Sequence, residues 1–115
     1  MAERKFWLRP EQIRPLIPNR GGCIASDRIT VDGKLVGYMY RGRPANELDN
    51  GWRFLAGDES QEYMHDTSKH TVYDVNTIAN HDPAIIPLLD SPVGAAYIRD
   101  WDTFEFLPDE PVVEE

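Results

Sequence analysis

Three histidines lie among carboxylates in the second half of the chain, and together these residue types could hold a metal ion. The histidines are His65, His70 and His81, so successive imidazoles are five and eleven residues apart. Imidazoles that share one face of a helix are instead three or four residues apart, and the pattern lacks the further ligands of zinc or iron motifs. The spacing therefore argues against a metal site. A small metal-dependent hydrolase that uses the His, Asp and Glu side chains of residues 58–82 stays open as an alternative function.

The sequence supports nucleophilic catalysis no better than it supports a metal site. None of the serines lies in a Gly-x-Ser-x-Gly elbow. The single cysteine, Cys23, has apolar surroundings in the sequence, and we expect it to be a small buried core residue. One cysteine forms no intrachain disulfide, and no apolar run reaches the length of a signal peptide or a membrane span. We therefore expect no catalytic residue, no cofactor and a cytoplasmic location.

Charge is distributed unevenly along the 115 residues. Residues 1–57 hold 10 Lys and Arg against 6 Asp and Glu, a net charge of +4, whereas residues 58–115 hold 2 against 14, a net charge of -12. The formal net charge of the whole chain is -8, which disfavours binding to nucleic acid phosphates or to an anionic membrane surface. Either the two halves pack together and neutralise each other, or the acidic half attracts a basic protein partner.

The elements that must position these side chains begin with a proline-rich lead-in. Residues 1–20 contain three prolines, which limit any helix there to a turn or two. The chain after residue 20 is rich in β-forming residues, and Asp32-Gly33 is the dipeptide that a two-residue hairpin turn prefers. The turn predicts a hairpin whose facing pairs are Ile29 with Val36, Asp27 with Tyr38, and Ala25 with Tyr40.

Strand and helix signals alternate through the rest of the chain. Over residues 51–57, the side chains of Trp52, Phe54 and Ala56 alternate with those of Arg53 and Leu55, and this period of two predicts a strand. Asp58 with Gln61 three residues later resembles a capping box and predicts a short helix over residues 59–66. The other expected elements are an extended piece over residues 69–74, a helical turn from Asp74 through Ile78, a short helix that starts at Asp82-Pro83, strands over residues 94–100 and 103–107, and a frayed acidic tail over residues 108–115.

Together these elements predict the α+β class, with a mainly antiparallel sheet of about five strands and short inserted helices. A chain of this length supports one core, so we expect a single domain over residues 21–107. Residues 1–20 would be a lead-in and residues 108–115 a tail. We expect Trp52 in the core and Trp101, which lies between two aspartates, at the surface as a contact residue.

Several short runs in the central segment follow one another in a specific order and spacing. They are Gly22-Cys23-Ile24-Ala25-Ser26-Asp27-Arg28-Ile29, Val36-Gly37-Tyr38-Met39-Tyr40-Arg41, Asp49-Asn50-Gly51-Trp52-Arg53-Phe54, Gly57-Asp58-Glu59, Tyr63-Met64, Val72-Tyr73-Asp74-Val75-Asn76-Thr77-Ile78 and Asp90-Ser91-Pro92. In these runs the chain resembles a bacterial family that was once catalogued as a domain of unknown function and is now grouped as immunity protein 33. The resemblance covers roughly residues 21 to 100.

The resemblance implies a small cytosolic protein, encoded beside a secreted toxin, that protects the producing cell by binding that toxin. It implies no catalytic residues and leaves the activity of the toxin open. Because an acidic inhibitor can cover a basic cleft, we hypothesise that the contact with the toxin falls after residue 57. The expected contact residues are Asp58, Glu59, Glu62, Tyr63, Asp66 and Trp101. A structural or regulatory module without a toxin partner is the remaining alternative.

Overall fold

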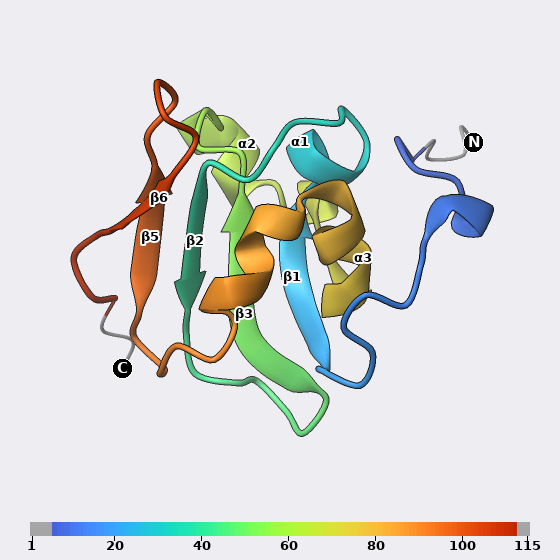
Figure 1. Ribbon diagram of the computed structural model, residues 1–115. Helices are drawn as coiled ribbons and strands as arrows, with labels where there is room; N and C mark the ends of the chain where they lie inside the picture. The colour runs from blue at the N-terminus through green and yellow to red at the C-terminus, as the bar shows by residue number, and fades with distance from the viewer. Residues whose placement is uncertain (1–5, 113–115) are drawn as a thin grey trace.

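Six strands form one mixed sheet in the computed structural model, which describes residues 6–112 of the chain (Figure 1). The strands are β1 (Gly22–Ser26), β2 (Tyr38–Arg41), β3 (Asp49–Leu55), β4 (His70–Asp74), β5 (Ala96–Arg99) and β6 (Phe106–Pro108). The helices are α1 (Asp27–Thr30), α2 (Gln61–His65) and α3 (Val75–His81), with the 3-10 helices η1 (Pro10–Gln12), η2 (Thr67–Lys69) and η3 (Pro83–Leu88). None of these helices is long and apolar enough to cross a membrane.

The strand order in the sheet is β4-β1-β3-β2-β5-β6. The pair β1–β3 is parallel, and the other four pairs of neighbouring strands are antiparallel. The parallel pair arises because the chain passes through α1 and β2 before it returns as β3 beside β1. The predicted α+β class, with a mostly antiparallel sheet and short helices in one domain, is confirmed.

The hairpin predicted around Asp32-Gly33 is wrong. The hydroxyl of Ser26 accepts a hydrogen bond from the backbone N–H of Arg28 at 3.1 Å, and this N-cap turns the chain into α1. Gly33 does adopt a positive φ of +78°, but there it ends the helical turn, because its N–H donates to the carbonyl of Ile29 at 3.2 Å. Ile29 is therefore buried in the core from a helix and faces no strand partner.

Most of the later elements lie in or beside their predicted ranges, and local capping explains why. The carboxylate of Asp74 accepts a hydrogen bond from the N–H of Asn76 at 2.9 Å and caps α3, as predicted. Asp82 caps η3 in the same way through the N–H of Ala84 at 3.2 Å. The cap of α2 is Ser60 and not Asp58, because Arg28 holds the carboxylate of Asp58.

The acidic tail is hydrogen-bonded to the sheet as far as Val112, so the expectation of a frayed tail is wrong for this stretch. The backbone N–H groups of Asp109 and Val112 donate to the carbonyls of Ala96 and Gly94, each at 2.9 Å. Residues 113–115 lie outside the described residues.

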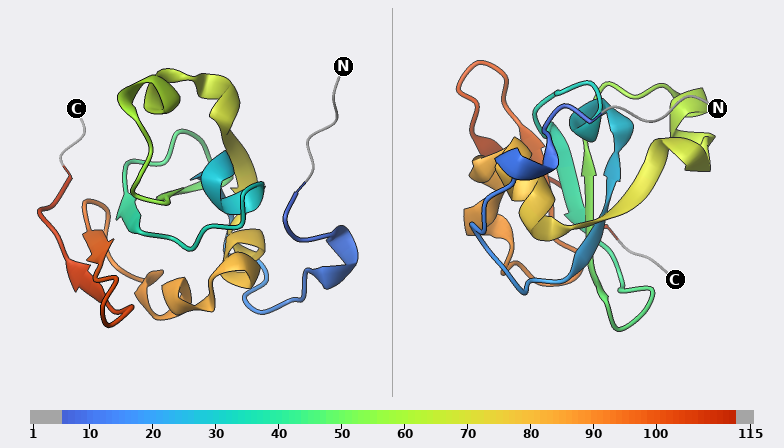
Figure 2. Two further views of the ribbon diagram at one scale, coloured as in Figure 1. Left: turned by 90° about the horizontal axis from the view of Figure 1, so that it is seen from above. Right: turned by 90° about the vertical axis from the view of Figure 1, so that its right-hand side faces the viewer.

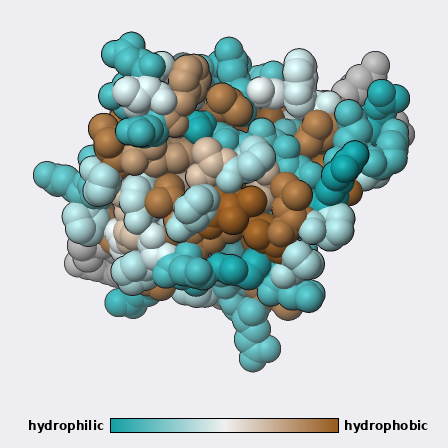
Figure 3. All heavy atoms as spheres, viewed as in Figure 1, coloured by the Kyte–Doolittle hydropathy of each residue, from teal (hydrophilic) through white to brown (hydrophobic). Residues whose placement is uncertain are grey.

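The core lies between the sheet and a layer formed by α3 and η3, which cover one face, whereas α2 lies on the opposite side (Figures 1 and 2). The rings of Trp52 and Phe54 stack in this core with centroids 6.0 Å apart, and the Trp52 indole N–H donates to the carbonyl of Leu89 at 3.1 Å. Trp52 and Cys23 are each 1% exposed, which confirms their predicted burial, and burial raises the pKa of the Cys23 thiol. The face that carries α3 and η3 has hydrophobic groups gathered over its middle and hydrophilic groups around its rim (Figure 3).

The opposite face of the sheet is less well covered. Side chains alternate along a strand, and Met39 of β2 is fully buried in the core, so Tyr38 and Tyr40 point to the second face, where both are half-buried. Cα register places Leu55 of β3 and Ile98 of β5 on either side of Tyr38. Ile98 is 48% exposed, so apolar surface on this face of the sheet meets solvent.

The lead-in runs along α3 and is held by two asparagine side chains one helical turn apart. The Asn76 side-chain oxygen accepts hydrogen bonds from the N–H groups of Leu16 and Ile17 at 2.9 and 3.0 Å. The Asn80 side-chain oxygen accepts from the N–H of Arg14 at 2.9 Å, and both side-chain amides donate to the Arg14 carbonyl at 2.8 Å. Ordered contacts of the chain therefore begin well before residue 21.

Candidate partner-binding surface

Five of the six predicted contact residues lie in one stretch, from the end of β3 to the start of η2. They are Asp58 and Glu59 in the β3–α2 turn, Glu62 and Tyr63 on α2, and Asp66 at the cap of η2. We call these five residues the α2 acidic surface. Some of their carboxylates are hydrogen-bonded within the molecule, so only part of the predicted negative charge is available to a partner.

Asp58 is bound within the molecule by Arg28. The guanidinium Nη2 lies 2.7 Å from Asp58 Oδ2 and Nε lies 3.2 Å from Oδ1, so the contact is bidentate. Nη1 of Arg28 lies 2.9 Å from Asp32 Oδ2. The hydrogen bonds that Arg28 donates to Asp58 hold the pKa of the Asp58 carboxyl below its usual range. One cation therefore bridges two carboxylates, and the local charge of this trio is reduced to about -1.

The side chain of Glu59 is hydrogen-bonded to the backbone of its own β3–α2 turn. Its carboxylate oxygens accept hydrogen bonds from the backbone N–H groups of Ala56 and Gly57 at 2.7 and 2.9 Å. Asp66 is occupied in the same manner at the start of η2, where it accepts from the N–H and the hydroxyl of Ser68 at 3.0 and 2.6 Å. These hydrogen bonds keep the pKa of Asp66 low, so its charge persists at neutral pH on an exposed side chain.

Glu62 is exposed in the first turn of α2, and its carboxylate makes no hydrogen bond or ion pair with the described residues. Tyr63 beside it is half-buried, and its ring meets that of His70 edge to face with centroids 5.8 Å apart. Burial raises the pKa of the Tyr63 hydroxyl. Glu62 is thus the carboxylate of this surface that is most open to a partner.

Trp101 lies in the β5–β6 loop and is 50% exposed, so its predicted place at the surface is confirmed. Its ring meets Phe104 edge to face at a centroid distance of 5.9 Å. The structure brings Trp101 next to the β3–α2 turn, because one hollow of about 360 Å³ is lined by Asp58, Gly57 and Trp101 together. Residues separated by more than forty positions in the sequence therefore share one surface.

The histidines do not assemble a metal centre in the part of the chain that the structure describes. His65 ends α2, His70 begins β4 and His81 ends α3. No group of three His, Cys, Asp or Glu side chains within residues 6–112 lies close enough to hold a metal ion. The alternative of a metal-dependent hydrolase therefore gains no support from the geometry.

Comparison with protein families matches residues 23–107 of the chain to the immunity protein Imm33 domain. The chain belongs to the Imm33 immunity protein family. The resemblance seen in the sequence is thereby confirmed, and a general role in immunity follows from it. Searches of curated proteins and of solved structures give no match. An immunity protein has a toxin as its partner in general, and membership favours a role without catalysis.

In this Imm33 domain, a buried ion pair between Arg99 and Asp82 lies close to Trp101, and no pattern in the sequence predicts it. Arg99 Nη1 lies 2.5 Å from Asp82 Oδ2, and both side chains are 4% exposed. The same Asp82 oxygen accepts the backbone N–H of Val36 at 3.0 Å, and Arg99 Nε donates to the carbonyl of Phe104 at 2.9 Å. The pair therefore ties η3, the start of β2 and the β5–β6 loop together. Its partners are 17 residues apart in the sequence, at a spacing that no local pattern marks.

Gly37 is a second residue of the Imm33 domain whose role only the structure shows. A Cβ atom at Gly37 would lie 2.0 Å from the carbonyl oxygen of Ala56 and 2.8 Å from the Trp101 indole. The missing side chain lets the β3 end and the indole approach the backbone of this residue. Glycine thus fixes the position of Trp101 by leaving space for it.

Proposed function

We propose that this chain is an immunity protein that binds and neutralises a cognate toxin through an acidic surface, without catalysis. The match to the Imm33 domain over residues 23–107 is the observation that carries the proposal. The net charge of -12 on residues 58–115 supports a basic contact surface on the toxin. The producing cell is protected if the toxin is bound inside it, so we propose a cytoplasmic location.

The mechanism is occlusion assisted by charge. Carboxylates such as Glu62 and Asp66 attract a basic toxin over several ångströms, and short-range contacts then hold it. Asp58 and Glu59 act on this surface through the fixed shape of the β3–α2 turn, since their oxygens are occupied by Arg28 and by backbone N–H groups. Neither nucleic acid nor membrane is a partner under this proposal, because both would be repelled by the same carboxylates.

Co-expression with the toxin encoded by the neighbouring gene tests the proposal. We expect the two proteins to copurify and the chain to relieve the growth defect that the toxin causes. The association rate should fall about tenfold or more between 50 mM and 500 mM salt, because salt screens attraction between charged surfaces. The measurement is surface-based binding kinetics at several salt concentrations.

Charge reversal at one exposed carboxylate sharpens the test. Glu62→Lys should weaken toxin binding about threefold to tenfold, mainly through a slower association rate. Glu47→Lys is the matched control, since Glu47 is an exposed glutamate in the β2–β3 loop and belongs to the basic half of the chain. Failure of the wild-type chain to bind the toxin would overturn the proposal. Equal binding by both variants would exclude the α2 acidic surface as the contact.

A further inference from the structure

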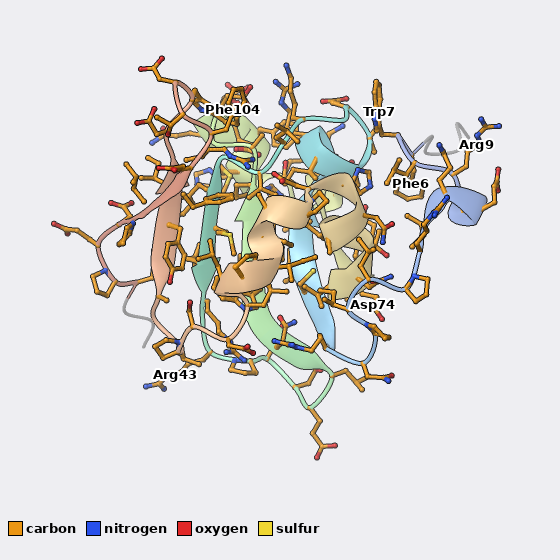
Figure 4. All side chains as sticks on the ribbon, in the orientation of Figure 1. Phe6, Trp7, Arg9, Arg43, Asp74 and Phe104 are labelled. Atoms are coloured by element: carbon orange, nitrogen blue, oxygen red, sulfur yellow. The ribbon has the colours of Figure 1, made fainter. Side chains whose placement is uncertain are left out.

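The β5–β6 segment exposes four large hydrophobic side chains within ten residues. They are Ile98, Trp101, Phe104 and Leu107, with exposed fractions of 48%, 50%, 53% and 45%. Single exposed hydrophobic residues are common on protein surfaces, but a contiguous group marks an interaction site. Phe104 lies in the loop between β5 and β6, whereas Trp7 lies beside α1 (Figure 4).

A hollow of about 500 Å³ adjoins this segment on the less covered face of the sheet. Its apolar lining comes from three parts of the chain: Tyr38 and Leu55 from the sheet, Met64 from α2, and Ile98 with Trp101 from the β5–β6 segment. The Trp101 indole also borders the smaller hollow beside Asp58, so it forms a wall between two depressions. We call the larger depression the Trp101 hollow.

The aromatic side chains of this segment are held in place before any partner arrives. Within the loop, the N–H of Asp100 donates to the carbonyl of Glu105 at 2.8 Å, and the N–H of Phe104 donates to the carbonyl of Asp100 at 2.6 Å. Phe104 adopts a positive φ of +63°, which is unfavourable for a bulky residue and persists because these bonds impose it. A fixed loop loses little conformational entropy on binding, which favours affinity.

Charge around the Trp101 hollow has one dominant sign. Glu59 and Asp109 line it, and residues 100–110 contain five Asp and Glu and no Lys or Arg. Arg99 also lines the hollow, but its guanidinium is buried in the ion pair with Asp82 and already lies over the Trp101 ring, with Cζ 5.7 Å from the ring centroid. Lys34 borders the smaller hollow. An apolar depression with an acidic rim is complementary to a basic amphipathic chain segment.

We propose that the Trp101 hollow is the docking site for a basic segment of the toxin, which inserts an arginine or lysine side chain. The aliphatic stem of that side chain packs against Tyr38, Leu55 and Ile98, and its charged group lies at the acidic rim, within reach of Glu59 and Asp109. This inference rests on the proposed function and adds the location of the main contact. It moves the centre of binding from the carboxylates of α2 to the aromatic β5–β6 loop.

Two aromatic substitutions test the docking site. Trp101→Ala should weaken binding of the neighbouring toxin about thirtyfold or more, as expected for a central anchor residue. Phe104→Gly should weaken it as well, and glycine suits the positive φ at this position, so this variant keeps the loop conformation. Trp7→Ala is the control, because Trp7 is 63% exposed and lies outside the hollow; its binding should stay within about twofold of the wild type.

The charged rim is tested separately with Asp109→Lys, which should weaken toxin binding by at least tenfold, against Glu47→Lys, which should leave it unchanged. Circular dichroism and urea unfolding of each variant establish that it is folded. If the wild type binds the toxin and the folded Trp101→Ala and Phe104→Gly variants bind equally well, the docking site is wrong and the proposed function stands. If the wild-type chain does not bind the toxin, the proposed function and the docking site both fail.

Discussion

At the scale of single residues, the buried pair Asp82–Arg99 links η3 to the β5–β6 loop that carries Trp101. Removal of one partner leaves a charge in the interior without compensation, which costs far more free energy than loss of a surface ion pair. Asp82→Ala should therefore lower the free energy of unfolding by about 3–5 kcal/mol in urea titrations. The double variant Asp82→Ala with Arg99→Met should lose less than the sum of the two single changes, because neither charge is then left alone.

A surface ion pair of the same chemical type is the control for this prediction. Arg20 and Asp90 pair at the surface, where their side chains are 40% and 90% exposed. Asp90→Ala should change the free energy of unfolding by about 0–1 kcal/mol. Equal effects of Asp82→Ala and Asp90→Ala would show that the buried pair does not organise the fold.

At the scale of elements, the lead-in depends on α3 more than on its own sequence. Its prolines prevent a long helix, and its backbone N–H groups are satisfied by Asn76 and Asn80. The double variant Asn76→Ala and Asn80→Ala should release residues 14–17 from α3. Within the described residues, these two side chains make the hydrogen bonds that join the lead-in to α3. Hydrogen exchange at Leu16 and Ile17 should become at least tenfold faster.

The core provides the internal control for the asparagine variant. β1 and β3 each have a neighbouring strand on both sides, so their amides should keep their slow exchange. Unchanged exchange at Leu16 and Ile17 would mean that the lead-in is held by its side chains, for example by the edge-to-face contact of Phe6 with Tyr73 at 6.0 Å.

Capping residues explain why the starts of α3 and η3 could be predicted from the sequence. Asp74 and Asp82 cap helices within two residues of themselves, so their role can be recognised from local sequence. Two local signals compete between Ser26 and Gly33: a helix N-cap followed by a glycine stop, and a hairpin turn around Asp32-Gly33. Both are compatible with a positive φ at Gly33, and the pairing of β1 with β3 and β4 decides in favour of the helix.

At the scale of the whole molecule, acid should destabilise the fold in two steps. Burial lowers the pKa of His81 below 6.5, so the unfolded chain takes up a proton near pH 6.5 that the folded chain does not. The contribution of neutral His81 is therefore complete above about pH 6.5 and is lost as the pH falls towards its folded pKa. The pKa values of Asp49 and Asp58 are lowered by Arg53 and Arg28, so their contributions are complete above about pH 4 and are lost below it.

Urea midpoints measured between pH 8 and pH 3 should show both steps. His81→Gln should remove the step near pH 6 and leave the loss below pH 4, because glutamine does not titrate. Persistence of the first step in His81→Gln would assign it to another group and would contradict the role given to the burial of His81.

By itself, the sequence determined the class of fold, the caps Asp74 and Asp82, the burial of Trp52 and Cys23, and the family. These properties depend on neighbouring residues or on the alternation of apolar side chains, which a linear pattern records. Most of the runs that resemble the family form strands of the sheet and helix caps, so they identify the fold. The charge split at residue 57, which makes the second half acidic, is also a property of the sequence alone.

Only the tertiary structure decided which carboxylates of that half face solvent. Asp58 meets Arg28 across 30 residues and Arg99 meets Asp82 across 17, and such pairs form because packing brings their elements together. The same packing places Gly37, Leu55 and Asp109 around Trp101. A hollow exists only where separate segments meet, so its position depends on the sum of long-range contacts and has no local signature in the chain.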